Sequence, residues 1–205
     1  MTQLTLHYFA PFDRSARVRW TALELGLDFV DNRLNYQAAE HRAEPFLKLS
    51  PVGFVPAIEW DGQSMFESGA ICLHLCETHA DRGLVPLTGE TGRNECLSWL
   101  FHMTSTMDRA CFDVFYPKVI APNEQAHAAA IERVQPLLSR IDRHLLGHEY
   151  FACGRFTVAD IMAGYALATL RRGGFPLAEY PAIAAYYDRV STRPAAVASG
   201  LFKGL

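Results

Sequence analysis

Two short segments of the chain carry groups that could bind an extended, peptide-like ligand. In the first, Val55 precedes Pro56 after a Gly-Phe turn, and Pro56 has no N–H to donate. If the bond between them is cis, Val55 turns its own N–H and C=O outward, where a ligand strand can pair with them. The alternative is an ordinary trans turn, because most X-Pro bonds are trans.

The second segment is Glu67-Ser68, at the expected end of a strand and start of a helix. Ser68 suits the helix N-cap, and a plain cap is the simplest interpretation. The same position offers free N–H groups and the positive end of the helix dipole to a ligand carboxylate. Glu67 can accept a hydrogen bond from a ligand ammonium. Together the two residues suit the α-amino acid head group of a ligand.

The elements around these segments form a recognisable order. Residues 4–9 and 28–34 read as strands and residues 15–25 as the helix between them, which predicts a parallel pair with a right-handed crossover. Residues 57–60 and 64–67 read as a hairpin across Asp61-Gly62, and residues 68–79 as the helix that follows. This order is that of a thioredoxin-like domain, which we assign to residues 1–80.

The rest of the chain has a different character. Residues 81–92 are rich in Gly and Pro and predict a linker. Residues 93–205 show helical periodicity without a clear strand, with helices expected over 93–116, 123–146, 157–171 and 179–192. Thr157 and Asp160 predict a capping box at the third of these helices. The predicted fold class is therefore α/β plus all-α, with a thioredoxin-like domain followed by an all-helical domain.

Composition narrows the function. The chain has 205 residues, is half hydrophobic and carries a net charge of −3, so it has no electrostatic reason to bind nucleic acid. No apolar run is long enough for a membrane span, and the N-terminus lacks the features of a signal peptide, so we expect a cytoplasmic protein. Cys72 and Cys76 share a helix face and make a metal pair conceivable, but buried core residues are the favoured interpretation. The five cysteines do not suggest a disulfide framework, and we expect no metal.

Three motifs together resemble the cytosolic glutathione S-transferase family. They are Ser50-Pro51-Val52-Gly53-Phe54-Val55-Pro56-Ala57-Ile58 followed by Asp61-Gly62 and Glu67-Ser68-Gly69-Ala70-Ile71, then the first-helix string Ser15-Ala16-Arg17-Val18-Arg19-Trp20, and the C-domain capping string Gly154-Arg155-Phe156-Thr157-Val158-Ala159-Asp160. They span nearly the whole chain, in the order and with the gaps of the family. The resemblance implies that the helical domain is the family's C-terminal domain.

The resemblance also implies a binding mode for glutathione, the co-substrate. Pro56 is expected to be cis, Val55 to pair through its backbone with the cysteinyl part, and Glu67-Ser68 to hold the γ-glutamyl group. Phe54 completes this set, at a position where members often carry Lys, Arg or Gln. Another cation is therefore expected to meet the glycyl carboxylate, and the candidates are Lys48, Arg42 and Arg14.

The activity that the resemblance implies is conjugation of the glutathione thiolate to a hydrophobic electrophile. A free thiol has a pKa near ~8.5, so a hydroxyl donor or a cation must stabilise the thiolate. The candidates are Tyr8, Ser15 and Arg14. In serine-type members the catalytic serine lies a few residues closer to the first strand than Ser15 does. This chain has Pro11, Phe12 and Asp13 at those positions. A cysteine-dependent thiol–disulfide mechanism is not expected, because no cysteine precedes Cys72.

The second substrate is expected between the domains, against an apolar wall of Phe12, Phe112 and Tyr116, although these residues and Phe115 also suit a helical core. The resemblance implies a homodimer, with Asp108 and Arg109 as candidates to face the partner subunit. A glutathione-dependent isomerase or peroxidase, or a non-catalytic glutathione-binding module, remains possible on the same fold. A thioredoxin-like structural protein that does not bind glutathione is a further alternative.

Overall fold

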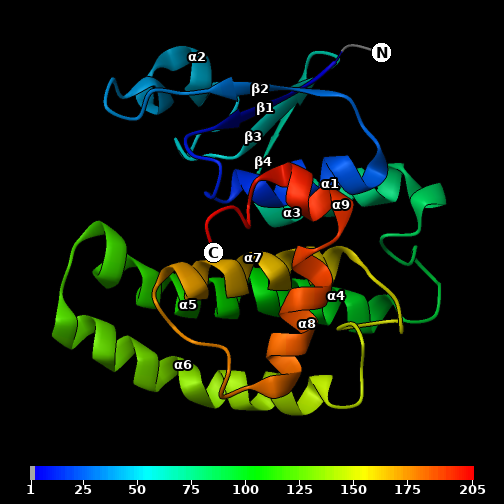
Figure 1. The fold of residues 1–205 in the computed structure, drawn as a ribbon. Helices are drawn as coiled ribbons and strands as arrows, with labels where there is room; N and C mark the ends of the chain where they lie inside the picture. Colours follow the sequence, from blue (N-terminus) through cyan, green and yellow to red (C-terminus); the bar gives the residue numbers. More distant parts are fainter. Residues whose placement is uncertain (1–2) are drawn as a thin grey trace.

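Residues 3–205 are described by a computed structural model; Met1 and Thr2, which entered the signal-peptide argument, lie outside the described residues. The N-terminal part contains one four-stranded mixed sheet in the order β2-β1-β3-β4 (Figure 1). Its strands are β1 (Leu4–Tyr8), β2 (Phe29–Arg33), β3 (Ala57–Trp60) and β4 (Gln63–Phe66). β1 and β2 are parallel, and β3 pairs antiparallel with both β1 and β4. The predicted β-α-β unit and hairpin are both present, and the thioredoxin-like fold is confirmed.

Local sequence signals explain the turns of this sheet. Asp61 and Gly62 have φ values of 46° and 75°, the left-handed conformations that a tight two-residue hairpin requires. Helix α1 (Ser15–Leu25) ends at Gly26 with φ 70°, where a residue with a side chain would be strained. α1 and α3 (Ser68–Thr78) cover the sheet face that looks toward the helical domain (Figure 1). The short α2 (Glu44–Leu47) and the 3₁₀ turn Glu40–Arg42 cover the other face.

The helical part begins with a long rod that is less regular than predicted. α4 (Arg93–Phe101) passes into π-helical turns (His102–Met107), then α5 (Asp108–Phe115), then further π-helical turns (Tyr116–Ile120). The hydroxyls of Thr104 and Ser105 donate to the carbonyls four residues back, Leu100 and Phe101, and thereby compete for the backbone acceptors. A π-turn adds a residue per turn, so it changes the direction in which the following side chains point.

That change of direction corrects one expectation. Asp108 does not face outward toward a partner: it is buried and paired with Arg14 and Arg17 of α1. Its neighbour Arg109 is exposed and pairs with Asp113 at 2.9 Å along the same helix. A single-helix pattern could not show this, because the direction of Asp108 depends on the irregular turns before it.

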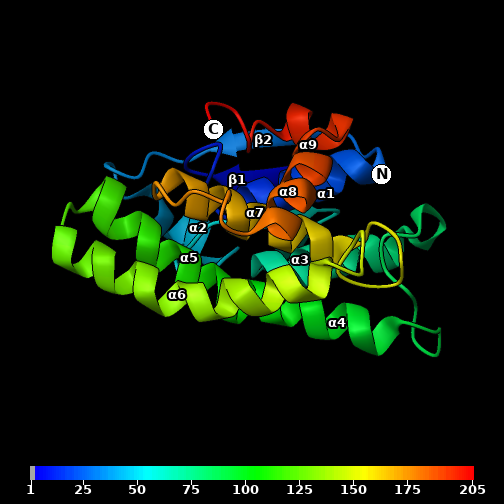
Figure 2. The same cartoon turned by 60° about the horizontal axis from the view of Figure 1, so that its bottom comes forward.

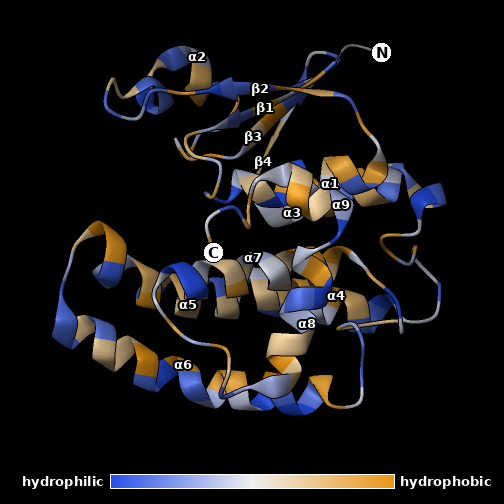
Figure 3. Cartoon of the chain, viewed as in Figure 1, coloured by the Kyte–Doolittle hydropathy of each residue, from blue (hydrophilic) through white to orange (hydrophobic). Residues whose placement is uncertain are grey.

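The remaining helices close around α7 (Val158–Arg172), which is buried along most of its length between α1 and α5 (Figure 2). Figure 3 shows apolar residues of α1, α3 and α7 meeting where the two parts of the chain pack together. The predicted capping box is present, with the Asp160 carboxylate accepting from Thr157 N–H at 2.8 Å. The other helices are α6 (Glu124–Leu145), α8 (Pro181–Ser191) and α9 (Pro194–Ser199), the last of which packs on α1.

Candidate active site

The register of the sheet brings the two predicted binding segments to one end. His7 of β1 lies opposite Ala57 of β3, and Ala57 lies opposite Phe66 of β4. The residues just beyond these pairs are Tyr8 and its loop, Val55-Pro56, and Glu67-Ser68. These segments, which are far apart in the sequence, therefore lie together at the same end of the sheet.

The Val55–Pro56 peptide bond is cis, as the resemblance implied. Val55 lies outside the strands, and among residues 3–205 no backbone hydrogen bond engages its N–H or C=O. The neighbouring Phe54 C=O is different, because it accepts from the Ser50 hydroxyl at 2.9 Å. Val55 therefore presents an unpaired peptide edge to which an extended ligand can add as a strand.

The start of α3 lies beside this edge. Glu67 occupies the cap position with φ 72°, a left-handed conformation that is uncommon for a residue with a side chain and is often found at functional sites. Ser68 is the first helical residue rather than the cap, and it is buried. Its Oγ accepts from Nη1 of Arg17 at 3.1 Å, which leaves its own hydroxyl proton for another acceptor. The exposed Glu67 carboxylate can accept from an ammonium, and the free N–H groups of α3 can donate to a carboxylate, which are the two charged groups of an amino-acid head group.

The sequence analysis did not single out Arg17, yet its side chain links α1 to the start of α3 and to α5. It is only 1% exposed and donates to both Ser68 and the Asp108 carboxylate. Its guanidinium also lies 4.2 Å from the ring centroid of Tyr165 on α7. Asp108 accepts in addition from Arg14, at 2.9 Å from Nε. Burial lowers the pKa of the Arg14 guanidinium, but the Asp108 carboxylate more than offsets this and raises the pKa above its ordinary value.

The three candidates for thiol activation occupy different environments. Tyr8 is half-buried at the end of β1, and the guanidinium of Arg19 lies 4.7 Å from its ring centroid. Ser15 is fully buried, and its hydroxyl donates to the Asp13 carboxylate. Arg14 is partly exposed, but its guanidinium is held by Asp108, as described above. Asp13 also accepts from three backbone N–H groups, those of Phe9, Ala10 and Ser15, and so fixes the loop that joins β1 to α1.

The candidates for binding the glycyl carboxylate of glutathione also differ in their surroundings. Lys48 pairs with Glu44 at 2.9 Å, and Arg14 is held in the Asp108 network. The Phe54 side chain is 70% exposed, so only its backbone shapes the loop. The remaining candidate is Arg42. The residue before it, His41, is buried, and its Nδ1 has no hydrogen-bond partner among the described residues. The only sequence signal for His41 was its position beside a cation in a polar stretch.

The predicted apolar wall is partly assembled. Phe112 and Tyr116 contact each other with ring centroids 5.6 Å apart, and Arg14 covers Phe112 at 5.5 Å. Phe12 lies in the loop before α1, is 43% exposed, and is covered by the Arg172 guanidinium at 5.1 Å. Phe115, in contrast, is buried in the helical core.

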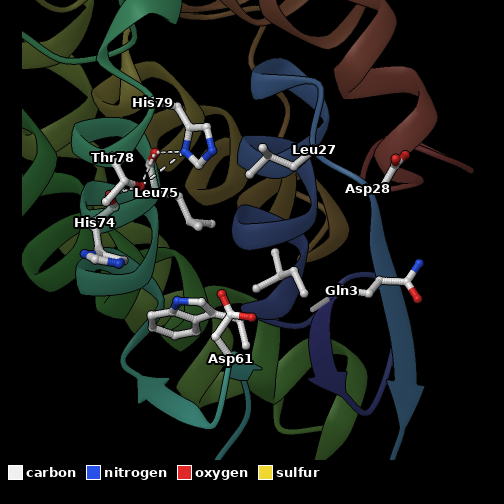
Figure 4. A pocket seen from close by; sticks show the side chains of 10 residues that line it. Gln3, Leu27, Asp28, Asp61, His74, Leu75, Thr78 and His79 are labelled. Carbon is white, nitrogen blue, oxygen red and sulfur yellow. Dashed lines mark hydrogen bonds between the residues drawn. The ribbon is translucent and has the colours of Figure 1, made fainter. Parts of the chain in front are cut away.

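A separate cavity lies elsewhere in the described part of the chain. It has a volume of about 650 Å³ and is lined by residues at the opposite end of the sheet, among them Leu27, Leu75, His74 and His79 (Figure 4). His79 Nδ1 already forms a hydrogen bond with the Leu75 carbonyl oxygen, at 2.9 Å. Among the described residues, this cavity has neither of the two features that converge at the Val55–Ser68 end, an unpaired peptide edge and a free helix terminus.

The cysteines are poorly suited to act as nucleophiles. Burial raises the pKa of Cys72 to about 12 and that of Cys96 to about 11. Within residues 3–205 there is no cluster of three or more histidine, cysteine or carboxylate side chains arranged to hold a metal ion. In the same range, no helix combines the length and apolarity that a membrane crossing requires.

Comparison with known proteins agrees with this geometry. The family model for the glutathione S-transferase N-terminal domain matches residues 4–77, and that for the C-terminal domain matches residues 124–189. A glutathione S-transferase from Hyoscyamus muticus is 29% identical over 203 residues, covering 94% of this chain and 95% of that protein.

Solved structures give the same result. A sphingomonad glutathione S-transferase complexed with glutathione is 31% identical, with a TM-score of 0.83 over 95% of this chain and 96% of that one. A glutathione transferase from Methylococcus capsulatus is 25% identical, with a TM-score of 0.83 over 96% of each chain. The chain therefore belongs to the glutathione S-transferase family of enzymes.

Proposed function

We propose that this protein binds glutathione along Val55 and the start of α3 and transfers its thiolate to a hydrophobic electrophile. The observation that carries the proposal is the unpaired peptide edge of Val55 beside the free N-terminus of α3. The cysteinyl unit pairs with the N–H and C=O of Val55 as an added strand. The γ-glutamyl carboxylate accepts from Ser68 and the α3 N–H groups, and its ammonium donates to Glu67. Phe54 shapes the loop through its backbone.

The glycyl carboxylate is assigned to His41 and Arg42. His41 Nδ1 is buried without a partner, and an incoming carboxylate would satisfy it. Gly53 brings the binding loop close to this residue: a Cβ on Gly53 would lie 3.2 Å from the His41 carbonyl oxygen. Lys48 and Arg14 are less suitable, because both are already paired with carboxylates.

We assign thiol activation to Tyr8. Among the three candidates, the Ser15 hydroxyl already donates to Asp13 and the Arg14 guanidinium to Asp108, whereas no hydrogen bond occupies the Tyr8 hydroxyl among residues 3–205. A phenol at the end of β1 can donate to the sulfur and so stabilise the thiolate. The electrophile then sits against Phe12, Phe112 and Tyr116.

The test compares Tyr8→Phe with Ser15→Ala in conjugation of 1-chloro-2,4-dinitrobenzene. Tyr8→Phe is expected to lower kcat by about 10²-fold with little change in glutathione affinity. Ser15→Ala is expected to reduce stability more than kcat, because its hydroxyl is part of the loop structure. A wild-type protein that binds glutathione but gives no turnover with this or any related electrophile would refute the transferase assignment.

We also propose that the protein is a homodimer, as the resemblance implied. Phe54 and Val52, on the loop before β3, are 70% and 51% exposed, and burial of these two apolar side chains against a partner subunit would favour association. Sedimentation equilibrium checks this proposal: a mass near 22.9 kDa at micromolar concentration would contradict it.

A further inference from the structure

Arg172, the last residue of α7, is a cation without a counter-ion. Its Nη2 donates to the carbonyls of Leu201 at 2.7 Å and Lys203 at 3.2 Å, so it is bound to the C-terminal tail. Its Nη1 is buried and has no hydrogen-bond partner, and no carboxylate pairs with it among residues 3–205. Burial also lowers the pKa of the guanidinium. A buried N–H on an unpaired cation is unfavourable for folding, so the presence of Arg172 at this position must have a reason other than stability.

The position of Arg172 supplies that explanation. Its guanidinium lies over the ring of Phe12, a residue of the predicted substrate wall on the loop that runs from Tyr8 to Ser15. Tyr165, about two turns earlier on α7, is within electrostatic reach of both Arg172 and Arg14. The unpaired cation therefore lies beside the loop to which thiol activation is assigned, on the side where the second substrate is expected.

We infer that Arg172 binds a carboxylate of the second substrate, so that the preferred electrophile is an apolar acid and not a neutral molecule. This inference rests on the proposed function, because it concerns the second-substrate side of the same site. Arg14 is less suited to this role, since its Nε and Nη2 already donate to Asp108, whereas Arg172 has no carboxylate partner among residues 3–205 and offers a free N–H. A planar guanidinium is well matched to a carboxylate, with which it can form two parallel hydrogen bonds.

Binding requires a small movement. Nη1 is buried in the structure, and the Phe12 ring lies over the guanidinium at 5.1 Å. That ring is 43% exposed and lies on a loop, so it can turn aside at little cost in packing. Once it has turned, the ring edge and the guanidinium together suit a substrate that carries an apolar ring and a carboxylate.

The test uses two electrophiles of similar shape, one charged and one neutral: 4-chloro-3-nitrobenzoate and its methyl ester. In both, the thiolate sulfur forms a bond to the ring carbon that bears chlorine, and chloride leaves with the bonding electron pair. The proton of glutathione is released to solvent when the thiolate forms. Because the ester is intrinsically more reactive, each kcat/KM is divided by the rate constant for glutathione alone.

The wild type is expected to favour the acid over the ester by roughly tenfold or more on this normalised scale, the size of one charge-assisted hydrogen bond. Arg172→Met should abolish that preference by raising KM for the acid about tenfold, and Arg172→Lys should retain part of it. Arg171→Met is the matched control: Arg171 precedes Arg172 on α7 but lies against Tyr187, at 4.9 Å from the ring centroid, and its loss should leave the preference intact.

A second measurement needs no variant and so does not depend on folding of Arg172→Met. With 1-chloro-2,4-dinitrobenzene as substrate, 3-nitrobenzoate should inhibit the wild type at least tenfold more strongly than methyl 3-nitrobenzoate. Equal normalised rates on acid and ester, or equal inhibition by the two nitrobenzoates, would overturn the role of Arg172 while leaving the transferase assignment in place. Absence of turnover with every electrophile, despite glutathione binding, would instead refute the transferase assignment itself.

Discussion

Arg17→Met is the most informative perturbation of the proposed glutathione site, because this one side chain contacts both Ser68 and Asp108. Arg17 donates to Ser68 and to Asp108, and its guanidinium stacks on Tyr165. Removing one partner of a buried ion pair typically costs about 3–5 kcal/mol. Arg14 still pairs with Asp108 in the variant, so we expect a loss of roughly 2–3 kcal/mol in the free energy of unfolding.

The assay is urea unfolding at a fixed protein concentration, because the stability of an oligomer depends on concentration. A double-mutant cycle of Arg17→Met with Asp108→Asn should give a coupling energy of about 1.5–3 kcal/mol. The matched control is the cycle between Arg109 and Asp113, an exposed pair at 2.9 Å on α5, for which we expect less than about 1 kcal/mol. Similar coupling in the two cycles would refute the reasoning, because burial would then make no difference.

Three further predictions concern single positions. Ser68→Ala should raise KM for glutathione about tenfold with little change in kcat, since the hydroxyl contributes to binding in ground state and transition state alike; a fall in kcat alone would contradict this. Gly164→Ala should lower the free energy of unfolding by roughly 1–3 kcal/mol, because its Cβ would lie 2.8 Å from the Trp20 ring, whereas Gly147→Ala, which meets nothing within 4 Å, should be neutral in thermal unfolding. Burial raises the pKa of Asp160 from its ordinary 3.8 to about 6, so its favourable contribution is complete below about pH 4 and is lost, by roughly 3 kcal/mol, as pH rises through 6. Urea unfolding between pH 4 and 7.5 should show that Asp160→Asn removes this slope, and an unchanged slope would show that another group titrates.

Features that depend on a few neighbouring residues were predictable from the sequence. Asp61-Gly62 specifies a hairpin because only residues that tolerate positive φ fit its turn, and Thr157 with Asp160 specifies a cap because the two side chains reach each other across one helical turn. Glu67-Ser68 marked a helix start for the same local reason. The order of such signals along the chain was enough to predict the thioredoxin-like domain and the helical domain after it.

Features that depend on partners distant in the sequence were not predictable. Ser68 suited a helix N-cap, but it is the first helical residue of α3 and its Oγ accepts from Arg17, 51 residues earlier on α1. Asp108 looked like an outward charge, but the π-helical turns before it redirect it toward α1. Helical periodicity assumes a constant angle per residue, so a few irregular turns are enough to invalidate it.

By itself, the sequence determined the family, the fold class and the segment from Val55 to Ser68 that we assign to glutathione, because each rests on short-range backbone preferences arranged in a characteristic order. Only the tertiary structure decided which cations are free. Among residues 3–205, it showed Arg14 bound to Asp108 and Arg172 without a carboxylate partner beside Phe12. Whether a charge is paired depends on side chains brought together across the fold, and no local pattern carries that information.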